Sequence, residues 1–411
     1  MTPSSRDSGS VRRRIDLALR DGLVSRWPFP EDAQSQLVLE AAGVGSWTIS
    51  SRAGKVIAEP GSVRRPTATV YVDAATLAEL LEGMHSGVEL WLKGFVRVRG
   101  SIALALKLEA LLKGPRPLHY ARPRRVQVAG IDTFVMEAGV GASDKLPVVL
   151  LHGLGATGAS MLPTLPPLAK EHRVIVPDLP GFGETGKPLI AYHAEFFARW
   201  VVDLLDALGI ERAVLIGNSM GGRISLEVGL KYPDRVGKLV LYCPAVAFRK
   251  LRQLVPLVRL VRPELGALPL RIPRSVVMRL MQQIFSRPDR VPAPWFDAAA
   301  DEFFRVFATR RGRIALFSAA RQVYLDHPWG ELGFWERLAE LQPPALFVWG
   351  DRDVLVPSGF SRHVEEALPR AKSVVLQDCG HVPQFELPEV LHSLVRNFLR
   401  EPQTPGIVSA T

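Results

Sequence analysis

The sequence predicts two domains in succession, an α+β domain followed by a larger α/β domain. The chain has 411 residues, which exceeds the roughly 250–300 residues that one hydrophobic core can organise. Residues 36–112 mix helices with strands that have one solvated face, whereas later strands are apolar throughout and alternate with helices. A basic, proline-punctuated segment over residues 114–125 separates the two patterns, and we interpret it as a linker.

The first domain is expected over residues 31–113, after an extension over residues 1–30. Apolar and polar residues alternate over 67–72 and 96–99, which predicts half-buried strands. The last helix, over residues 101–112, has Ser101 as its cap and apolar side chains around most of its circumference. Such a helix is either deeply buried in a core or lines an apolar cavity, and the pattern leaves both open.

The order of these elements resembles the sterol carrier protein lipid-binding family over about residues 33–113. The match includes the strand between Gly94 and Gly100 that precedes the last helix, and it departs from the family at Arg97 and Arg99. The resemblance implies a sheet with helices around an apolar tunnel, and a lipid or acyl chain as the ligand. It implies no catalytic residue, because that family binds its ligands without reacting with them.

The second domain is expected over residues 126–402, followed by a tail over 403–411. In it, Ser219 lies in the pattern Gly-x-Ser-x-Gly, between an apolar strand and a helical segment. Small residues at Gly217 and Gly221 allow a sharp turn with little conflict of Cβ atoms. Because such a turn exposes the serine oxygen at a helix N-terminus, we interpret Ser219 as a nucleophile.

Two later loops at strand ends supply partners for this serine, in the order serine, acid, histidine. His381 follows the short strand over 373–376 and is the expected general base, which takes the proton from Ser219 and later passes it to the leaving group. Asp351 and Asp353 both follow the apolar strand over 345–349, and either could orient the histidine.

From about residue 126 to residue 399 the chain resembles the α/β-hydrolase superfamily. In that family the acid loop has a glycine, two variable residues, an aspartate and a Val-Pro pair, which match Gly350, Asp353 and 356–357. The resemblance therefore implies that Asp353 is the catalytic acid and that Asp351 stabilises the loop or lies at the surface. Some members of the family carry the acid after the strand that follows the nucleophile helix. In this chain the corresponding loop, over residues 243–247, holds no carboxylate, so that alternative fails.

The sequence over residues 152–155, His-Gly-Leu-Gly, resembles the oxyanion loop of the same family. By that match the backbone N–H groups of Leu154 and Met220 would hold the oxyanion, and each such donor is worth roughly 10²–10³ in rate. His152 is then expected to support the loop, and the turn over 178–183 is expected to be structural.

We expect no metal and no cofactor. No spacing of His, Cys and Asp is typical of a zinc site, and the glycines at 153 and 155 lack the continuation of a dinucleotide site. Cys243 and Cys379 are the only cysteines, and we interpret them as buried structural thiols.

Residues 245–341 predict a helical cap, which in this family determines substrate choice. Arginines and large apolar residues alternate in its first part, which fits either a surface that contacts anionic lipid or a cap helix with solvated arginines. The net charge of +10 fits both, and nothing indicates a nucleic-acid partner. With no apolar stretch of 18 residues and no signal core, the expected location is cytoplasmic or peripheral to a membrane.

Three hypotheses of function remain. The first is a serine hydrolase that cleaves carboxylic esters, or thioesters, of lipophilic substrates through an acyl-enzyme, while the attached domain raises the local lipid concentration. The second is a carbon–carbon bond hydrolase, because residues 217–222 resemble the turn of meta-cleavage-product hydrolases. Those enzymes usually have a tryptophan after the catalytic histidine, where this chain has Val382. The third is a lipid carrier or lipid-binding protein, against which an intact triad argues.

Overall fold

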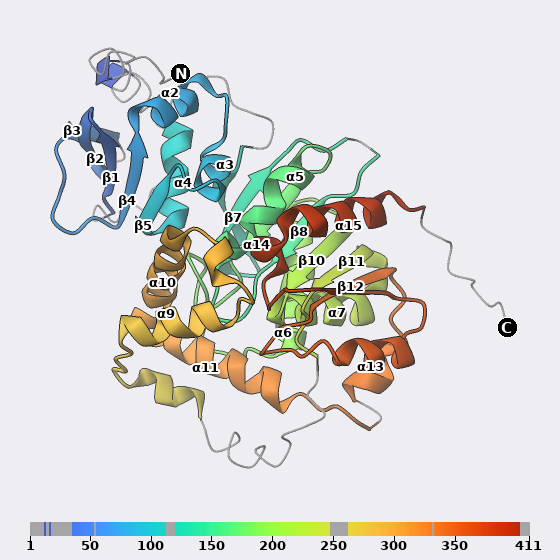
Figure 1. Ribbon diagram of the computed structural model, residues 1–411. Coiled ribbons are helices and arrows are strands. Elements are labelled where there is room, and N and C mark those ends of the chain that lie inside the picture. Colours follow the sequence, from blue (N-terminus) through green and yellow to red (C-terminus); the bar gives the residue numbers. More distant parts are fainter. Residues whose placement is uncertain are drawn as a thin grey trace.

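The structure is a computed structural model that describes residues 12–13, 16–17, 35–52, 55–111, 120–142, 144–246, 262–330 and 333–402. Most of the predicted N-terminal extension, the predicted linker up to residue 119, the first part of the predicted cap (247–261) and the predicted tail (403–411) lie outside the described residues. Within the described residues the strands form two separate sheets, one in each half of the chain (Figure 1).

The smaller sheet has the strand order β3-β2-β1-β4-β5. Its strands are β1 (Leu37–Ala42), β2 (Gly45–Arg52), β3 (Lys55–Pro60), β4 (Ala68–Asp73) and β5 (Arg97–Gly100). Neighbouring strands are antiparallel, except that β1 and β4 are parallel. On β5, Val98 is buried while Arg97 and Arg99 are exposed, so this strand has one solvated face, as its alternation predicts.

In the described part of this domain the sheet is accompanied by the helices α2 (Ala74–Glu82), α3 (Gly87–Leu92) and α4 (Ile102–Leu111). Their ends are determined by local side chains. Asp73 accepts a hydrogen bond from the Thr76 N–H (2.8 Å), and Ser86 and Glu89 form a reciprocal capping box. Ser101 accepts from the Leu104 N–H (3.1 Å), so α4 begins one residue after its cap.

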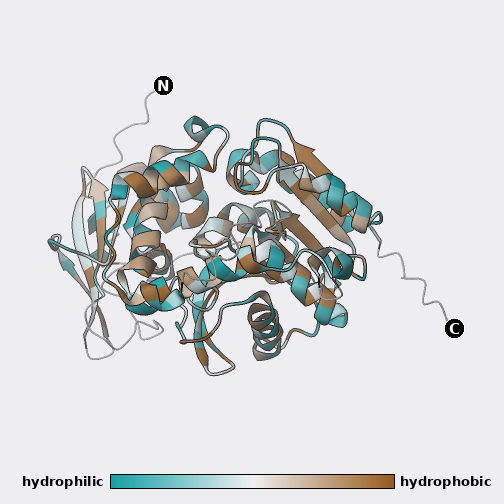
Figure 2. Cartoon of the chain, turned by 90° about the horizontal axis from the view of Figure 1, so that it is seen from below, coloured by the Kyte–Doolittle hydropathy of each residue, from teal (hydrophilic) through white to brown (hydrophobic). Residues whose placement is uncertain are grey.

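The larger sheet has the order β13-β12-β11-β10-β8-β9-β7-β6. Its strands are β6 (Arg122–Val128), β7 (Ile131–Ala138), β8 (Val148–Leu151), β9 (Val174–Pro177), β10 (Ala213–Asn218), β11 (Val236–Tyr242), β12 (Ala345–Gly350) and β13 (Lys372–Leu376). The strands from β13 to β9 are parallel, and β7 and β6 are antiparallel to their neighbours. The central strands are buried along their whole length and strongly hydrophobic (Figure 2), because helices cover both faces.

One face of the larger sheet packs against η1 (Gly158–Thr164), α5 (Leu165–Ala169) and α15 (Pro388–Arg400). The other face packs against α6 (Ala194–Ala207), α7 (Met220–Lys231), α12 (Phe334–Leu338) and α13 (Phe360–Ala367). Two short elements, η2 (Pro233–Arg235) and α14 (Pro383–Glu386), lie in connections. These layers confirm the predicted architecture of an α+β domain followed by an α/β domain.

The described part of the cap lies between β11 and β12. It consists of η4 (Pro263–Ala267), α9 (Arg274–Gln283), η5 (Pro288–Arg290), α10 (Ala293–Ala308) and α11 (Arg310–Leu325). Figure 1 shows α9, α10 and α11 together below the smaller domain and beside the larger sheet. In the described residues no helix is long and apolar enough to cross a membrane.

Helix α10 of the cap connects the two domains. Asp301 accepts from the Gly100 N–H (2.9 Å) and from Arg99 Nε (2.7 Å), at the end of β5. The next residue, Glu302, accepts from the Ile102 N–H (2.7 Å), the first residue of α4. The cap therefore supplies a carboxylate to the N-terminus of a helix in the other domain, where negative charge is favoured.

The titration of Glu302 gives this interface a testable pH dependence. Burial raises the pKa of Glu302 to about 7, although nearby Arg305 opposes the shift. The folded protein then holds this proton more tightly than the unfolded chain. Protonation of Glu302 therefore stabilises the folded state fully below the ordinary glutamate pKa, and this contribution to the free energy of unfolding is lost as pH rises through about 7. Glu302→Gln keeps an acceptor for Ile102 but cannot ionise. The difference in melting temperature, Glu302→Gln minus wild type, should therefore increase by a few degrees from about pH 5 to about pH 8, because only the wild type loses stability by ionising.

The matched control is Glu340→Gln, which changes an exposed glutamate. Its melting temperature should follow that of the wild type across the same range. Parallel pH profiles for Glu302→Gln and wild type would show that Glu302 is ionised equally in the folded and unfolded states.

Candidate active site

Ser219 occupies a strained turn between β10 and α7. Its φ of 55° and ψ of −116° lie outside the regions that residues with a side chain usually adopt. A Cβ atom at Gly217 would overlap the backbone of Gly221, and a Cβ at Gly221 would overlap the Leu151 carbonyl. Glycine is therefore required at both positions for the strand and the helix to approach each other this closely. The turn leaves Ser219 partly exposed at the start of α7.

Asn218, which the sequence did not single out, fixes this turn to two other loops. Its buried side-chain amide donates to the carbonyl of Tyr242 at the end of β11 (3.0 Å) and to the carbonyl of His381 (3.1 Å). The Ser219 N–H also donates to the Tyr242 carbonyl (2.9 Å). The serine turn and the histidine loop are thus held together through one side chain.

His381 and Asp353 form a buried pair. His381 Nδ1 lies 2.7 Å from Asp353 Oδ2, and the two side chains are 5% and 0% exposed. The other oxygen of Asp353 accepts from the N–H groups of Leu355 (2.8 Å) and Val356 (2.9 Å), which fixes the carboxylate. Because Asp353 is an acceptor, Nδ1 carries the proton in the neutral ring and Nε2 is left as the base.

Asp351, the other candidate acid, lies elsewhere in the same loop. Its Oδ1 accepts from the Cys379 N–H (3.1 Å), and its own N–H donates to the Leu376 carbonyl (3.0 Å). These bonds connect the loop after β12 to the end of β13. Of the two aspartates, the structure brings Asp353 to the histidine and gives Asp351 a loop-stabilising position.

Glu386 supports the histidine loop from behind, and no motif in the sequence indicated it. Its buried carboxylate accepts from the N–H groups of Gly380 (2.8 Å) and Ser286 (2.7 Å), and burial raises its pKa. The His381 N–H donates to the Ile284 carbonyl (2.8 Å). The cap segment after α9 therefore helps to hold the histidine in place.

The predicted oxyanion loop lies directly against the serine. A Cβ atom at Gly153 would be 3.3 Å from the Ser219 Cβ. Leu154 follows it and is 36% exposed, and Met220 is the first residue of α7, so its N–H has no acceptor within the helix. Gly153, next to Leu154, thus lies against Ser219, and Met220 directly follows the serine in the chain; the role of the Leu154 and Met220 N–H groups as oxyanion donors remains a prediction.

His152 supports this loop. Its Nδ1 lies 2.8 Å from the Gly153 carbonyl, and its Nε2 accepts from the Leu179 N–H (2.9 Å). Burial lowers the pKa of His152 to about 4, so the ring is neutral and both nitrogens are occupied by the backbone. Asp178 has a similar structural position, because it accepts from the N–H groups of Gly158 (2.7 Å) and Glu184 (2.8 Å).

Both cysteines are free and buried. Burial raises the pKa of each thiol, so neither is poised as a nucleophile. Among the described residues, Cys243, Asp353 and His381 place possible metal ligands within 4.8 Å of one another. The aspartate and histidine atoms of this group already bond to each other and the thiol is protonated, which fits a proton-transfer pair better than a metal site.

Apolar side chains of the cap lie against the predicted oxyanion loop. A Cβ at Gly155 would lie 3.6 Å from Leu316 on α11 and 3.8 Å from Phe303 on α10. On the side of the histidine loop, Phe285 contacts Phe296 (5.0 Å between ring centroids) and Phe385 (6.4 Å). The surroundings of the serine are therefore suited to lipophilic groups.

Comparison with family models identifies both domains. Residues 147–388 match the model described as the alpha/beta hydrolase fold, and residues 33–113 match the SCP-2 sterol transfer family. Both resemblances inferred from the sequence are confirmed.

Three relatives illustrate the range of similar proteins. The chain is 31% identical over 295 residues to a 2-hydroxymuconate semialdehyde hydrolase from Pseudomonas sp. strain CF600, an alignment of 69% of this chain and 96% of that one. The chain is also similar to the crystal structure of a membrane phospholipase A, described as a bacterial virulence factor, with 26% sequence identity and a TM-score of 0.57. The match covers 79% of this chain and 94% of the phospholipase chain. A meta-cleavage product hydrolase is 27% identical with a TM-score of 0.52, over 68% and 98% of the two chains.

The close approach at the serine turn predicts a large effect of one added methyl group. Gly221→Ala places a Cβ on the Leu151 carbonyl and should lower the free energy of unfolding by about 3 kcal/mol or more, because the backbone must move. Urea unfolding followed by circular dichroism measures this loss. Gly359→Ala is the matched control, because its Cβ would meet nothing within 4 Å and its φ is −58°. Equal stability of the two variants would contradict the close contact.

Proposed function

Because this chain belongs to the alpha/beta hydrolase fold family and carries an SCP-2 sterol transfer domain, we propose that it is a serine hydrolase of lipophilic carboxylic esters or thioesters. The observation that carries the proposal is the strained Ser219 turn held beside the buried His381–Asp353 pair. A nucleophile, a base and an orienting acid in this arrangement are the requirements of acyl transfer.

The proposed reaction proceeds through an acyl-enzyme. His381 Nε2 takes the proton of Ser219 Oγ while the oxygen attacks the carbonyl carbon of the substrate, and the N–H groups of Leu154 and Met220 hold the resulting oxyanion. Collapse of the intermediate expels the alcohol or thiol, which receives the proton from His381. Water then attacks the acyl-enzyme, gives a proton to His381 and releases the acid, and the proton returns to Ser219. Asp353 remains ionised and stabilises the imidazolium.

Two observations support a lipophilic substrate. The first domain matches a family described as sterol transfer, and it holds an apolar cavity. The similar membrane phospholipase A, at 26% identity over 94% of its length, has a lipid ester as the substrate that its name indicates. We therefore assign a lipid or acyl chain to the first domain and a lipophilic ester to the second.

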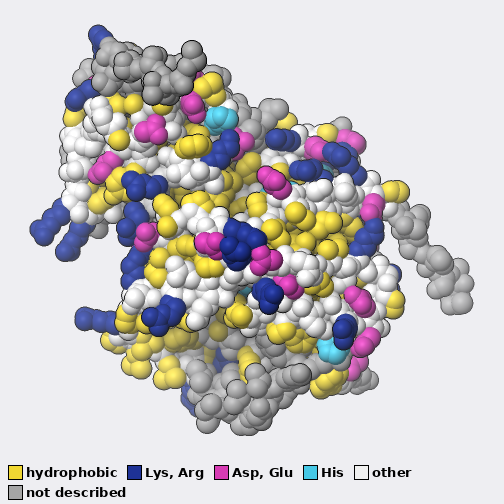
Figure 3. Space-filling view, in the orientation of Figure 1, with side chains coloured by type: hydrophobic (Ala, Val, Ile, Leu, Met, Phe, Trp, Pro, Cys, Tyr) yellow, Lys and Arg dark blue, Asp and Glu magenta, His cyan; other side chains and the backbone are white. Residues whose placement is uncertain are grey.

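Contact with an anionic membrane surface is part of this proposal. Residues 262–283 of the cap expose large apolar side chains beside arginines; the exposed residues are Leu265, Leu268, Leu270, Val276 and Leu280, with Arg262, Arg271 and Arg279. Figure 3 shows hydrophobic and basic side chains mixed at the lower left, where this part of the cap lies in Figure 1. Such a surface suits a protein of the cytoplasm that binds peripherally to anionic lipid.

Replacement of the serine tests the central assignment. Ser219→Ala should lower the hydrolysis of p-nitrophenyl esters by roughly 10³-fold or more, because it removes the nucleophile. The rates are measured with esters from acetate to palmitate, and the proposal requires a preference for long chains. Ser225→Ala, a buried serine on the same helix, should keep its activity. Full activity in Ser219→Ala would exclude the proposed mechanism.

The two aspartates give a second test. Asp353→Asn should lower kcat by roughly 10³–10⁴, because an amide at this position favours the wrong tautomer of His381. Asp351→Asn lies in the same loop without a bond to the histidine and should stay within about tenfold of wild type. Melting temperatures of both variants establish that they fold. Equal losses of kcat would show that Asp353 does not orient the histidine.

A second candidate is carbon–carbon bond hydrolysis. The observation that favours it is the 31% identity to a 2-hydroxymuconate semialdehyde hydrolase, of which the chain covers 96%. Val382 after the histidine counts against it. Assays of the same preparation with 2-hydroxymuconate semialdehyde and with p-nitrophenyl esters separate the two, because the true reaction has the larger kcat/KM. Lipid binding with no hydrolysis of either would favour a carrier.

A further inference from the structure

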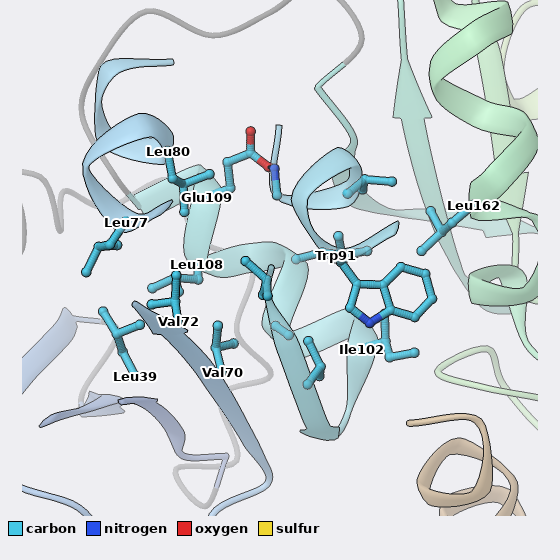
Figure 4. A pocket seen from close by; sticks show the side chains of 16 residues that line it. Leu39, Val70, Val72, Leu77, Leu80, Trp91, Ile102, Leu108, Glu109 and Leu162 are labelled. Atoms are coloured by element: carbon cyan, nitrogen blue, oxygen red, sulfur yellow. The ribbon is translucent and has the colours of Figure 1, made fainter. Parts of the chain in front are cut away.

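The first domain holds a narrow apolar cavity between its sheet and its three helices (Figure 4). Its lining side chains come from β1, β4 and β5 on one side and from α2, α3 and α4 on the other, and include Leu39, Val70, Leu77 and Leu108. The one lining carboxylate, Glu109, accepts from the Gly87 N–H (2.8 Å). The cavity volume is about 40 Å³, so a long hydrocarbon chain could enter only if these side chains repack.

The hydrolase domain completes the wall of this cavity. Leu162 of η1 is one of the lining residues and is fully buried. Figure 4 shows it across from Trp91 of α3, at the end of the cavity away from Leu77. The segment η1 begins two residues after the oxyanion loop turn at Ala156, and its Ser160 carbonyl accepts from Gln384 (3.3 Å). The cavity therefore reaches η1, which follows the predicted oxyanion loop and is bonded to α14 after His381.

Trp91 lies at this end of the cavity with an unused hydrogen-bond donor. The residue is 6% exposed, and its Nε1 has no partner within the described part of the chain. Its carbonyl, in contrast, accepts from Trp295 Nε1 (2.9 Å). Figure 4 shows the indole nitrogen on the side of Ile102. An unsatisfied buried donor is costly. Because Trp91 also lines the cavity, an acceptor atom of a bound ligand could satisfy this N–H.

Aromatic contacts connect Trp91 to the histidine loop. The rings of Trp91 and Trp295 of the cap stack with centroids 5.3 Å apart. Trp295 in turn contacts Phe385 at 5.1 Å, four residues after His381 on α14. A chain of aromatic contacts thus joins the Trp91 end of the cavity to the helix that follows His381.

We propose that Trp91 Nε1 donates a hydrogen bond to the carbonyl or carboxylate oxygen of a long-chain ligand whose hydrocarbon occupies this cavity. The hydrocarbon points toward Leu77 and Leu39, and the polar end faces the hydrolase domain. The inference rests on the proposed function, because the ligand that matches this chemistry is the fatty ester substrate or its fatty acid product. It makes the cavity a site that both domains build.

The indole resonances of the full chain provide the test. The chain has eight tryptophans, and Trp91→Phe identifies the signal of Trp91 in a protein labelled with ¹⁵N at the indole. Ser219→Ala prevents turnover while laurate, methyl laurate or dodecane is added. Laurate or methyl laurate should move the Trp91 proton downfield, and dodecane, which has no acceptor, should not. Trp200 is the matched control, because its Nε1 is also buried with no partner among the described residues but lies in the core of the hydrolase domain.

Affinity provides the second readout. Trp91→Phe keeps an aromatic ring and removes the donor, so it should weaken laurate or methyl laurate about fivefold and leave dodecane unchanged. A response to the ester alone identifies the substrate as the ligand, and a response to laurate alone identifies the product. An unmoved Trp91 signal, an equal response to dodecane or unchanged affinity in Trp91→Phe would overturn the proposal. The proposed function is tested separately by comparing the hydrolysis of p-nitrophenyl acetate in the wild type and in Ser219→Ala. A loss of hydrolysis in Ser219→Ala supports the proposed function whatever the Trp91 signal does.

Discussion

The candidate site depends on one close contact, between the start of α7 and the carboxyl ends of β8 and β10. Because Gly221 lies against the Leu151 carbonyl, the helix begins directly above the sheet, and the chain between strand and helix must pass through the strained conformation of Ser219. The same contact brings the loop after β8 to the serine at Gly153. Strain at a single residue is thereby stabilised by the packing of three buried elements.

The other partners follow from the order of the parallel strands. Asp353 and His381 come after β12 and β13, which are neighbours at one edge of the sheet, so their loops meet at the carboxyl ends. A buried carboxylate is costly unless its oxygens are satisfied. Two backbone N–H groups and the imidazole satisfy those of Asp353. The carboxylate is therefore fixed in one orientation, with one oxygen on the imidazole Nδ1 and the other on two backbone N–H groups.

The sequence was informative where chemistry follows from spacing along the chain. The glycines around Ser219 and the order of serine, acid and histidine are local patterns, and they predicted which elements the structure brings together. Asn218, Glu386 and Glu302 could not be found in this way. Their hydrogen bonds connect residues about 100 to 200 positions apart in the chain. A single buried polar residue also has no periodic pattern that would reveal it in the sequence.

The position of α10 changes how the two domains are expected to cooperate. A carrier on a flexible linker acts only by raising the local concentration of its ligand. Here the cap contacts the first domain through Asp301, Glu302 and Trp295, and the apolar core of that domain is continuous with one face of the larger sheet. Outward movement of α10 would break a buried carboxylate bond and separate two stacked indoles. The position of α10 is therefore tied to the contacts between the two domains, which a carrier on a flexible linker would not have.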